Sequence, residues 1–207
     1  MKKILSLLVV LILSVALTTS CTNKNNVEND KSDITEEENN IEKTLEADEN
    51  TEGEADEDGE VKEGIFPGNK AYDFTLLDRE GKEISLSSLR GKVVFLNFWT
   101  SWCRYCKAEM PDMQKVHEEY KDKDVVILAV NITALEKNGA EDVNKFLKEK
   151  KFTFPVLYDK EGAVSVQYRV SSLPTTYILN KDGIIANFVT GALSEKRIKE
   201  EIQAAME

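Results

Sequence analysis

Two cysteines three residues apart, Cys103 and Cys106, are the residues of this chain whose types and spacing most clearly predict chemistry. They follow an apolar run, Val93–Trp99, that is typical of a buried strand. If a helix starts at the cysteines, the two sulfurs lie within bonding reach and can alternate between dithiol and disulfide with little backbone movement. A disulfide that closes so short a loop adds little stability. The spacing therefore predicts a redox-active pair that exchanges thiols and disulfides.

The start of a helix also favours a thiolate at Cys103. Unpaired backbone N–H groups and the positive end of the helix dipole lie near the first turn, and Arg104 is a candidate thiolate stabiliser because it adds a positive charge. Thiols in such settings have pKa values of roughly 3.5–7.5 instead of about 8.5. We therefore expect Cys103 to attack substrate disulfides and Cys106, one turn further along, to resolve the mixed disulfide.

The third cysteine, Cys21, belongs to a different pattern. Two lysines precede an apolar run, Ile4–Leu17, and Cys21 follows after three short polar residues. This pattern predicts that residues 1–21 are a bacterial secretion signal with Cys21 as the lipid acceptor. The alternative is an uncleaved signal anchor, although the run is shorter than the roughly 20 apolar residues of a membrane span. Both interpretations place the folded part on the outer face of the cytoplasmic membrane.

Acidic residues are concentrated between this signal and the cysteine pair. Residues 22–64 contain seventeen Asp and Glu but four Lys, whereas residues 65–207 contain 21 residues of each sign. The net charge of −11 therefore comes from residues 22–64, which have too few apolar side chains to fold and are predicted to form an acidic disordered linker. Binding of cations or of a basic partner is the alternative for this segment. Residues 65–207 have the size of one domain.

Strand and helix patterns alternate along residues 65–207, which predicts an α/β fold. A hairpin is expected over Tyr72–Leu77 and Glu83–Leu86, and a helix from about Tyr105 to Tyr120 that Pro111 should kink. Further strands are expected at Val125–Asn131, Thr175–Leu179 and Ile184–Val189, and further helices at Glu141–Lys150 and from a Ser194 cap to about Met206.

The segment Gly91–Cys103 resembles the active-site strand and turn of the TlpA/ResA-like membrane-anchored thioredoxins. The resemblance continues in Ala71–Leu76, in Glu109-Met110-Pro111 and in Leu173-Pro174-Thr175-Thr176, and it covers nearly all of residues 65–207. It implies a thioredoxin fold with an N-terminal hairpin extension and an inserted strand-helix segment, here around Val125–Lys151. The arrangement of two cysteines, a later proline and a downstream L-P-T-T is far more specific than the two cysteines alone.

The resemblance also implies roles for residues outside the cysteine pair. Pro174 matches the family's cis-proline, which with Leu173 and Thr175 lies over the cysteines and presents backbone groups to the substrate. Glu109 matches a glutamate tied to redox behaviour in ResA-like proteins. Because Asn97 stands where general thioredoxins carry a buried aspartate, Glu109 is the candidate proton acceptor for Cys106. A solvated surface glutamate is the alternative.

Aromatic residues flank the cysteines on their N-terminal side. An exposed Trp102 could dock an apolar substrate surface, with rim packing as the alternative, and Trp99 is expected in the core. The expected substrates are disulfide-containing proteins, and no nucleic-acid partner is expected. The resemblance implies re-reduction by a membrane electron carrier resembling CcdA or DsbD and names apocytochrome c as the leading substrate, which no residue of the chain specifies.

Other functions make different demands on the same cysteines. A disulfide-forming oxidase would run the exchange in the opposite direction and differs in redox potential. Thr100 completes the Thr-x-x-Cys pattern of a peroxiredoxin-type peroxidase, but an upstream proline is missing, and a copper-delivery module resembling the Sco proteins has three residues between its cysteines. A zinc site needs about four ligands, and His117, expected at the surface, is the one histidine. We expect neither a metal nor a cofactor.

Overall fold

The computed structural model describes residues 61–207, so the expected signal, Cys21 and residues 22–60 of the expected linker lie outside the described residues. Seven strands form one sheet: β3 (Thr75–Asp78), β4 (Glu83–Ser85), β5 (Val93–Trp99), β6 (Val125–Asn131), β7 (Val156–Tyr158), β8 (Thr175–Leu179) and β9 (Ile185–Thr190). Their order is β4-β3-β7-β6-β5-β8-β9. Strands β5, β6 and β7 are parallel, and the other pairs are antiparallel.

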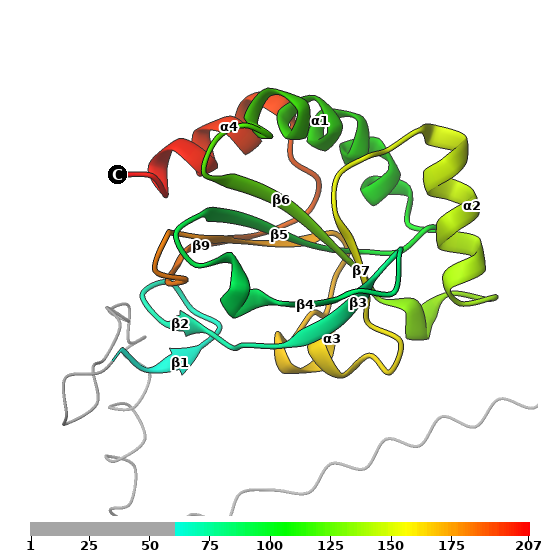
Figure 1. The fold of residues 1–207 in the computed structure, drawn as a ribbon, viewed down its shortest axis with the longest axis horizontal. Coiled ribbons are helices and arrows are strands. Elements are labelled where there is room, and N and C mark those ends of the chain that lie inside the picture. The colour runs from blue at the N-terminus through cyan, green and yellow to red at the C-terminus, as the bar shows by residue number, and fades with distance from the viewer. Residues whose placement is uncertain (1–60) are drawn as a thin grey trace, which may run out of the picture. The chain divides into compact units, whose positions relative to one another are not determined.

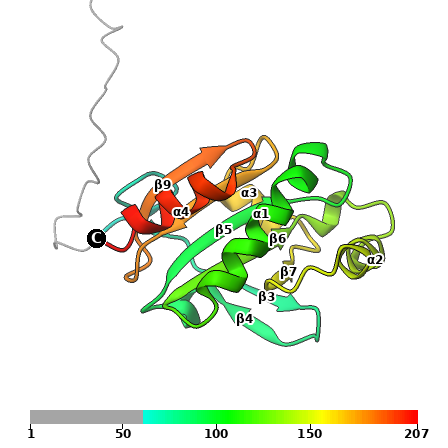
Figure 2. The same ribbon diagram turned by 90° about the horizontal axis from the view of Figure 1, so that it is seen from above.

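Helices cover both faces of this sheet. They are α1 (Arg104–Tyr120), α2 (Ala140–Lys150), α3 (Ala163–Gln167) and α4 (Glu195–Ala204). Helices α1 and α4 lie side by side on one face and α3 lies on the other, as Figure 1 shows; Figure 2 gives the view from above. Among residues 61–207, no helix is long and apolar enough to cross a membrane.

Strand β5 lies next to the middle of the sheet and is buried along its whole length. Its residues alternate between the two faces, so that Phe95 and Trp99 join the apolar cluster with α1, α2 and α4, whereas Leu96 and Phe98 join the opposite cluster with α3. Because both faces are covered, the strand has apolar residues at successive positions, as the sequence indicated. It ends at Trp99, directly before the turn that carries the cysteines.

Helix α1 buries the side chains predicted from its period, which are Met110, Met113, Val116 and Tyr120. Pro111 lies inside the helix, where its missing N–H leaves the carbonyl of Lys107 without a helical donor. The hairpin β3–β4 and the inserted β6 and α2 also form as expected. Ser194 caps α4 by accepting the Arg197 N–H at 3.4 Å, and His117 is half-buried with its ring edge-on to Phe154.

Some elements differ from the expectation. Strand β7 and helix α3 were not predicted, because runs of three and five residues are too short to show a period. A separate two-stranded sheet pairs β1 (Glu63–Gly64) with β2 (Lys70–Ala71) in parallel. Among the described residues, regular structure therefore includes the last residues of the segment expected to be linker, just ahead of Ile65.

Candidate active site

The two cysteines stand at the N-terminus of α1, as their spacing predicts. Cys103 is the N-cap residue and Cys106 lies in the first turn, and the pair forms a disulfide with Cα atoms 5.3 Å apart. The Sγ of Cys103 also accepts the backbone N–H of Cys106 at 3.1 Å. This sulfur therefore occupies the place of a capping oxygen, at the positive end of the helix dipole. In the reduced protein the same contact would favour a thiolate at Cys103.

The two sulfurs have unequal surroundings. Cys103 is 6% exposed and forms part of the wall of a groove. Cys106 is 1% exposed. Both residues belong to the apolar cluster beneath α1, but Cys106 is not among the residues that line the groove. Of the two cysteines, Cys103 is therefore the one that lines the groove.

Glu109 is buried on α1, one helical turn after Cys106, with 1% of its surface exposed. Its Oε1 accepts the backbone N–H of Leu193 at 3.0 Å, and its Oε2 accepts Nδ2 of Asn97 at 3.2 Å. Burial raises the pKa of the carboxyl from 4.5 to about 7, although both hydrogen bonds oppose the rise. The burial excludes the alternative of a solvated surface glutamate. A carboxyl that is partly ionised near neutral pH can accept a proton and release it again.

Asn97 links Glu109 to the strand that carries the proline loop. Its Nδ2 donates to Glu109 and also to Oγ1 of Thr176 in β8, at 2.9 Å. An aspartate at position 97 would put a second carboxylate against Glu109, whereas the amide supplies a donor. Asn97 therefore allows the acidic group of the site to lie on α1. The partners Thr176 and Leu193 were not foreseen, because they lie far away in the sequence.

The loop before β8 approaches the cysteines from the other side of the groove. The Leu173–Pro174 peptide bond is cis, as the resemblance implied. The Pro174 carbonyl accepts the Gly191 N–H at 2.8 Å, and Thr175 Oγ1 donates to the Ser172 carbonyl at 2.8 Å. Within residues 61–207, the backbone N–H and C=O of Leu173 form no hydrogen bond. Among the described residues, the backbone of Leu173 therefore has an unused donor and an unused acceptor beside the groove that this residue lines.

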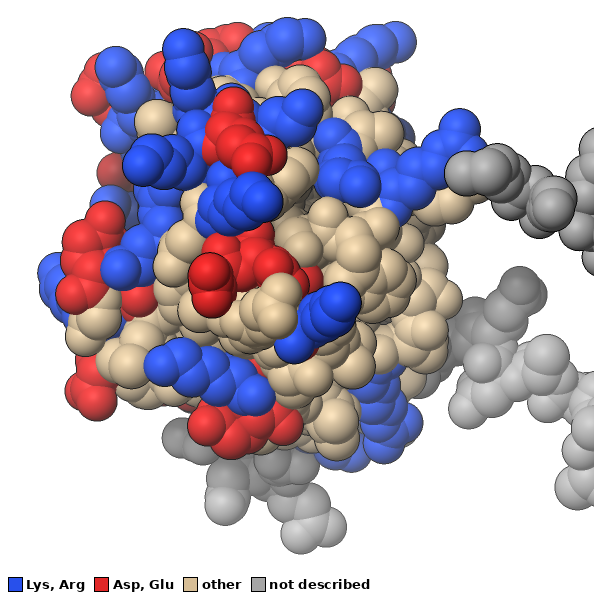
Figure 3. Space-filling view, turned by 90° about the vertical axis from the view of Figure 1, so that its right-hand side faces the viewer, with Lys and Arg blue, Asp and Glu red and all other residues tan. Residues whose placement is uncertain are grey.

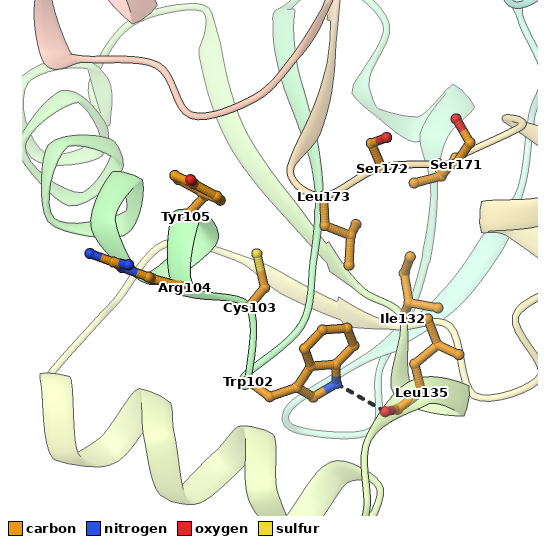
Figure 4. A pocket seen from close by; sticks show the side chains of 10 residues that line it. Trp102, Cys103, Arg104, Tyr105, Ile132, Leu135, Ser171, Ser172 and Leu173 are labelled. Carbon is orange, nitrogen blue, oxygen red and sulfur yellow. Dashed lines mark hydrogen bonds between the residues drawn. The ribbon is translucent and has the colours of Figure 1, made fainter. Parts of the chain in front are cut away.

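The groove beside Cys103 has a volume of about 530 Å³ and is mainly apolar (Figure 4). Three of its side chains are large, apolar and more than half exposed: Trp102, Tyr105 and Leu135. Its other lining residues are Cys103, Arg104, Ile132, Val170, Ser171, Ser172 and Leu173. Figure 3, which faces the right-hand side of Figure 1, shows an area without charged side chains next to one crowded with them. Arg104 is the one charged residue of this lining, so the groove suits a mainly apolar stretch of polypeptide.

Trp102 and Arg104, the two site candidates next to Cys103, are both exposed. Trp102 is 58% exposed, and its Nε1 donates to the carbonyl of Leu135 at 3.0 Å, so its indole is held at the rim of the groove. Arg104 is exposed, and its guanidinium points away from the Cys103 sulfur in Figure 4. Trp99 is fully buried and packs against Phe146 of α2, which confirms its expected place in the core.

Comparisons with known proteins agree with this geometry. A sequence profile of the AhpC/TSA family matches residues 67–188. The thioredoxin-like protein YneN of Bacillus subtilis is 41% identical over 139 residues, which cover 67% of this chain and 80% of YneN. The thiol-disulfide oxidoreductase ResA of the same species is 42% identical over 137 residues, which cover 66% of this chain and 74% of ResA.

Solved structures lead to the same group of proteins. StoA from Bacillus subtilis is 30% identical, with a TM-score of 0.58 over 67% of this chain and 98% of StoA. The exposed lipoprotein thioredoxin Etrx1 from Streptococcus pneumoniae is 31% identical, with a TM-score of 0.58 over 64% of this chain and 98% of Etrx1. These likenesses confirm the predicted thioredoxin-like fold. The chain belongs to the AhpC/TSA family and, within it, to the ResA-like thiol–disulfide oxidoreductases.

Proposed function

We propose that this chain reduces disulfide bonds in other proteins, with Cys103 as the nucleophile and Cys106 as the resolving thiol. The observation that supports this assignment best is the unequal setting of the two sulfurs. Cys103 opens onto the groove, whereas Cys106 is buried one helical turn before Glu109. An enzyme that forms a mixed disulfide and then resolves it needs one accessible and one protected sulfur.

The reaction proceeds in two exchange steps. The Cys103 thiolate first attacks one sulfur of the substrate disulfide, a mixed disulfide forms, and the other substrate sulfur leaves as a thiolate and is protonated. The Cys106 thiolate then attacks Cys103 Sγ, the second substrate sulfur leaves and is protonated, and the Cys103–Cys106 disulfide remains. Two electrons pass from the cysteine pair to the substrate. The two substrate thiolates take up two protons, one that Cys106 gives up and one from solvent, because Cys103 reacts as a thiolate.

Glu109 serves the second step as the proton acceptor. Cys106 must lose its proton before it attacks, and burial in an apolar cluster raises the pKa of a thiol. A carboxyl with a pKa of about 7 is partly ionised at neutral pH and can take that proton. The Cys103 thiolate is stabilised in a different way, by the Cys106 N–H and by the start of α1. Arg104 adds to this an exposed charge that solvent screens.

The substrate is positioned by four residues around the groove: Leu173, Pro174, Thr175 and Trp102. The free backbone groups of Leu173 can pair with an extended chain, as at the edge of a sheet. Pro174 has no N–H of its own, and Thr175 holds the preceding loop through the Ser172 carbonyl. Trp102 provides an apolar surface across the groove for side chains next to the substrate disulfide.

The proposed location is the outer face of the cytoplasmic membrane, with a lipid on Cys21 and the acidic segment, residues 22–64, as the tether. Each turnover leaves the protein oxidised, so a dithiol donor has to restore it. A membrane electron carrier resembling CcdA or DsbD is the proposed donor, and apocytochrome c is the proposed leading substrate. The name of Etrx1 describes an exposed lipoprotein, which supports this location by analogy.

The thiol state of the protein in its own cells tests the direction of the reaction. Cells are quenched in acid, free thiols are labelled with a maleimide that adds mass, and the full chain is detected on a gel. A reductase is kept ready by its donor, so we expect most molecules to carry Cys103 and Cys106 as dithiols. A population that is almost entirely disulfide-bonded would instead indicate an oxidase and overturn the proposal.

A further inference from the structure

A buried carboxylate in the inserted segment contacts the turn that leads into Cys103. Glu136 is 8% exposed. Its Oε1 accepts the backbone N–H of Ser101, and its Oε2 accepts the hydroxyl of the same residue, both at 2.6 Å. The distance from the hydroxyl is typical of a charge-assisted O–H···O hydrogen bond. A single carboxylate therefore binds both donors of the residue two positions before the proposed nucleophile.

The inserted segment also holds the next residue of the turn. The Leu135 carbonyl accepts Nε1 of Trp102 at 3.0 Å, as Figure 4 shows. Within the turn itself, the Cys103 N–H donates to the Thr100 carbonyl at 3.3 Å. Consecutive residues of the inserted segment thus fix the consecutive residues Ser101 and Trp102, and Cys103 follows directly.

Glu136 is itself held in place by residues near the end of β6. Asn131, the last residue of that strand, donates Nδ2 to Glu136 Oε1 at 2.8 Å. Thr133 Oγ1 donates to the amide oxygen of Asn131 at 2.9 Å, which turns the amide nitrogen toward the carboxylate. Asn131 also lies opposite Trp99 in the parallel pairing of β6 with β5. The carboxylate is therefore anchored to the sheet independently of the turn that it holds.

We propose that Glu136 is a positioning residue for thiol–disulfide exchange, which keeps the Ser101–Cys103 turn in the conformation that holds the Cys103 sulfur within bonding reach of Cys106. Two groups that are held in place react as if at high effective concentration. A fixed turn therefore favours the disulfide, and a loosened turn favours the dithiol. This role applies whether the protein reduces or oxidises its substrates, so its test is independent of the proposed direction.

The variant Glu136→Gln tests the proposal. Glutamine keeps the size of the side chain but replaces one acceptor oxygen with an NH₂ group and removes the charge. The full-length chain is equilibrated with glutathione, so that the protein disulfide and two glutathione thiols exchange with the protein dithiol and one glutathione disulfide. We expect the equilibrium constant to shift about tenfold toward the dithiol, which corresponds to a potential about 30 mV less negative.

Glu201→Gln is the matched control. Glu201 is also a buried carboxylate, 5% exposed, and accepts Nδ2 of Asn187 at 2.9 Å, but it lies on α4. Both variants should lower the free energy of unfolding, and the control should leave the redox equilibrium unchanged. If Glu136→Gln also leaves that equilibrium within twofold of the wild type, Glu136 has a structural role only and the proposal is refuted.

Ser101→Ala keeps the test decisive if Glu136→Gln does not fold. It removes one of the two hydrogen bonds from Ser101 and keeps the backbone N–H that makes the other. We expect a shift of about threefold toward the dithiol, and an unchanged equilibrium would overturn the proposal. Where both single variants fold, the double variant should shift the equilibrium by less than the product of the two, because both act through one contact.

Discussion

Replacing Glu109 by glutamine removes the proposed proton acceptor and one buried ionisable group in a single change. In the disulfide form, the pKa of this carboxyl rises from 4.5 to about 7 because of burial. At 1.36 kcal/mol for each pKa unit, this rise corresponds to about 3 kcal/mol. The folded protein binds a proton that the unfolded chain has already released above pH 4.5, so this contribution to stability is complete below that pH and is lost as the pH rises to about 7.

The raised pKa of Glu109 predicts how the free energy of unfolding depends on pH. Between pH 5 and pH 8, wild-type protein should lose up to about 3 kcal/mol of unfolding free energy that Glu109→Gln does not lose, because glutamine does not ionise. Urea unfolding of the disulfide form at both pH values measures the difference. Glu201→Gln provides the control for the loss of another buried carboxylate. If the unfolding free energy changes equally between pH 5 and pH 8 in wild type and in Glu109→Gln, the Glu109 carboxyl has an ordinary pKa.

The same variant tests the role of Glu109 in the resolving step. A reduced enzyme that reacts with Ellman's reagent releases one thionitrobenzoate when Cys103 attacks and a second when Cys106 resolves the mixed disulfide. The rate of the second release should rise with pH through about 7 in wild type. In Glu109→Gln it should fall about a hundredfold or more at neutral pH, the usual contribution of a positioned base. A second phase with unchanged rate and pH profile would refute the assignment.

Three further substitutions test the resolving thiol, the partner of Glu109 and the lipid anchor. Cys106→Ser should accumulate mixed disulfides through Cys103, detected on non-reducing gels; if they form and then resolve normally, Cys106 is not the resolving thiol. Asn97→Asp should destabilise the fold by about 1–3 kcal/mol, and by more at pH 8 than at pH 5, because it sets a second carboxylate against Glu109; equal urea midpoints for variant and wild type would contradict this. Cys21→Ala should move the protein from the membrane to the soluble fraction, whereas retention would support an uncleaved signal anchor.

The sequence predicted the elements whose patterns are long. Strands β5, β6 and β8 appear as apolar runs, and α1 appears through buried residues at three- and four-residue spacing. Strand β7 was missed, because Val156–Tyr158 follows a proline and spans three residues, and its place is set by pairing with β6 and β3. A pairing of this kind depends on residues distant in the chain and leaves no local period.

The residues of the candidate site also differ in whether local sequence could predict them. The cysteine pair and its place at a helix start follow from local spacing, and Glu109 was a candidate because it lies three residues after Cys106. Its burial could not be predicted, because the Leu193 N–H that it accepts lies 84 residues away. The contact of Glu136 with Ser101 spans 35 residues and joins the inserted segment to the active-site turn. Carboxylates bound by distant donors look like surface residues in a sequence.

The redox potential of the Cys103–Cys106 pair tests most directly whether this protein is a reductase. The full-length chain is equilibrated in dithiothreitol or glutathione buffers of known potential, and the fraction of dithiol is measured by thiol labelling. We predict a value near about −270 mV or below, as in thioredoxin, which suits a reductase supplied by a membrane electron carrier. A value near about −120 mV, as in strong disulfide donors, would contradict the proposed direction.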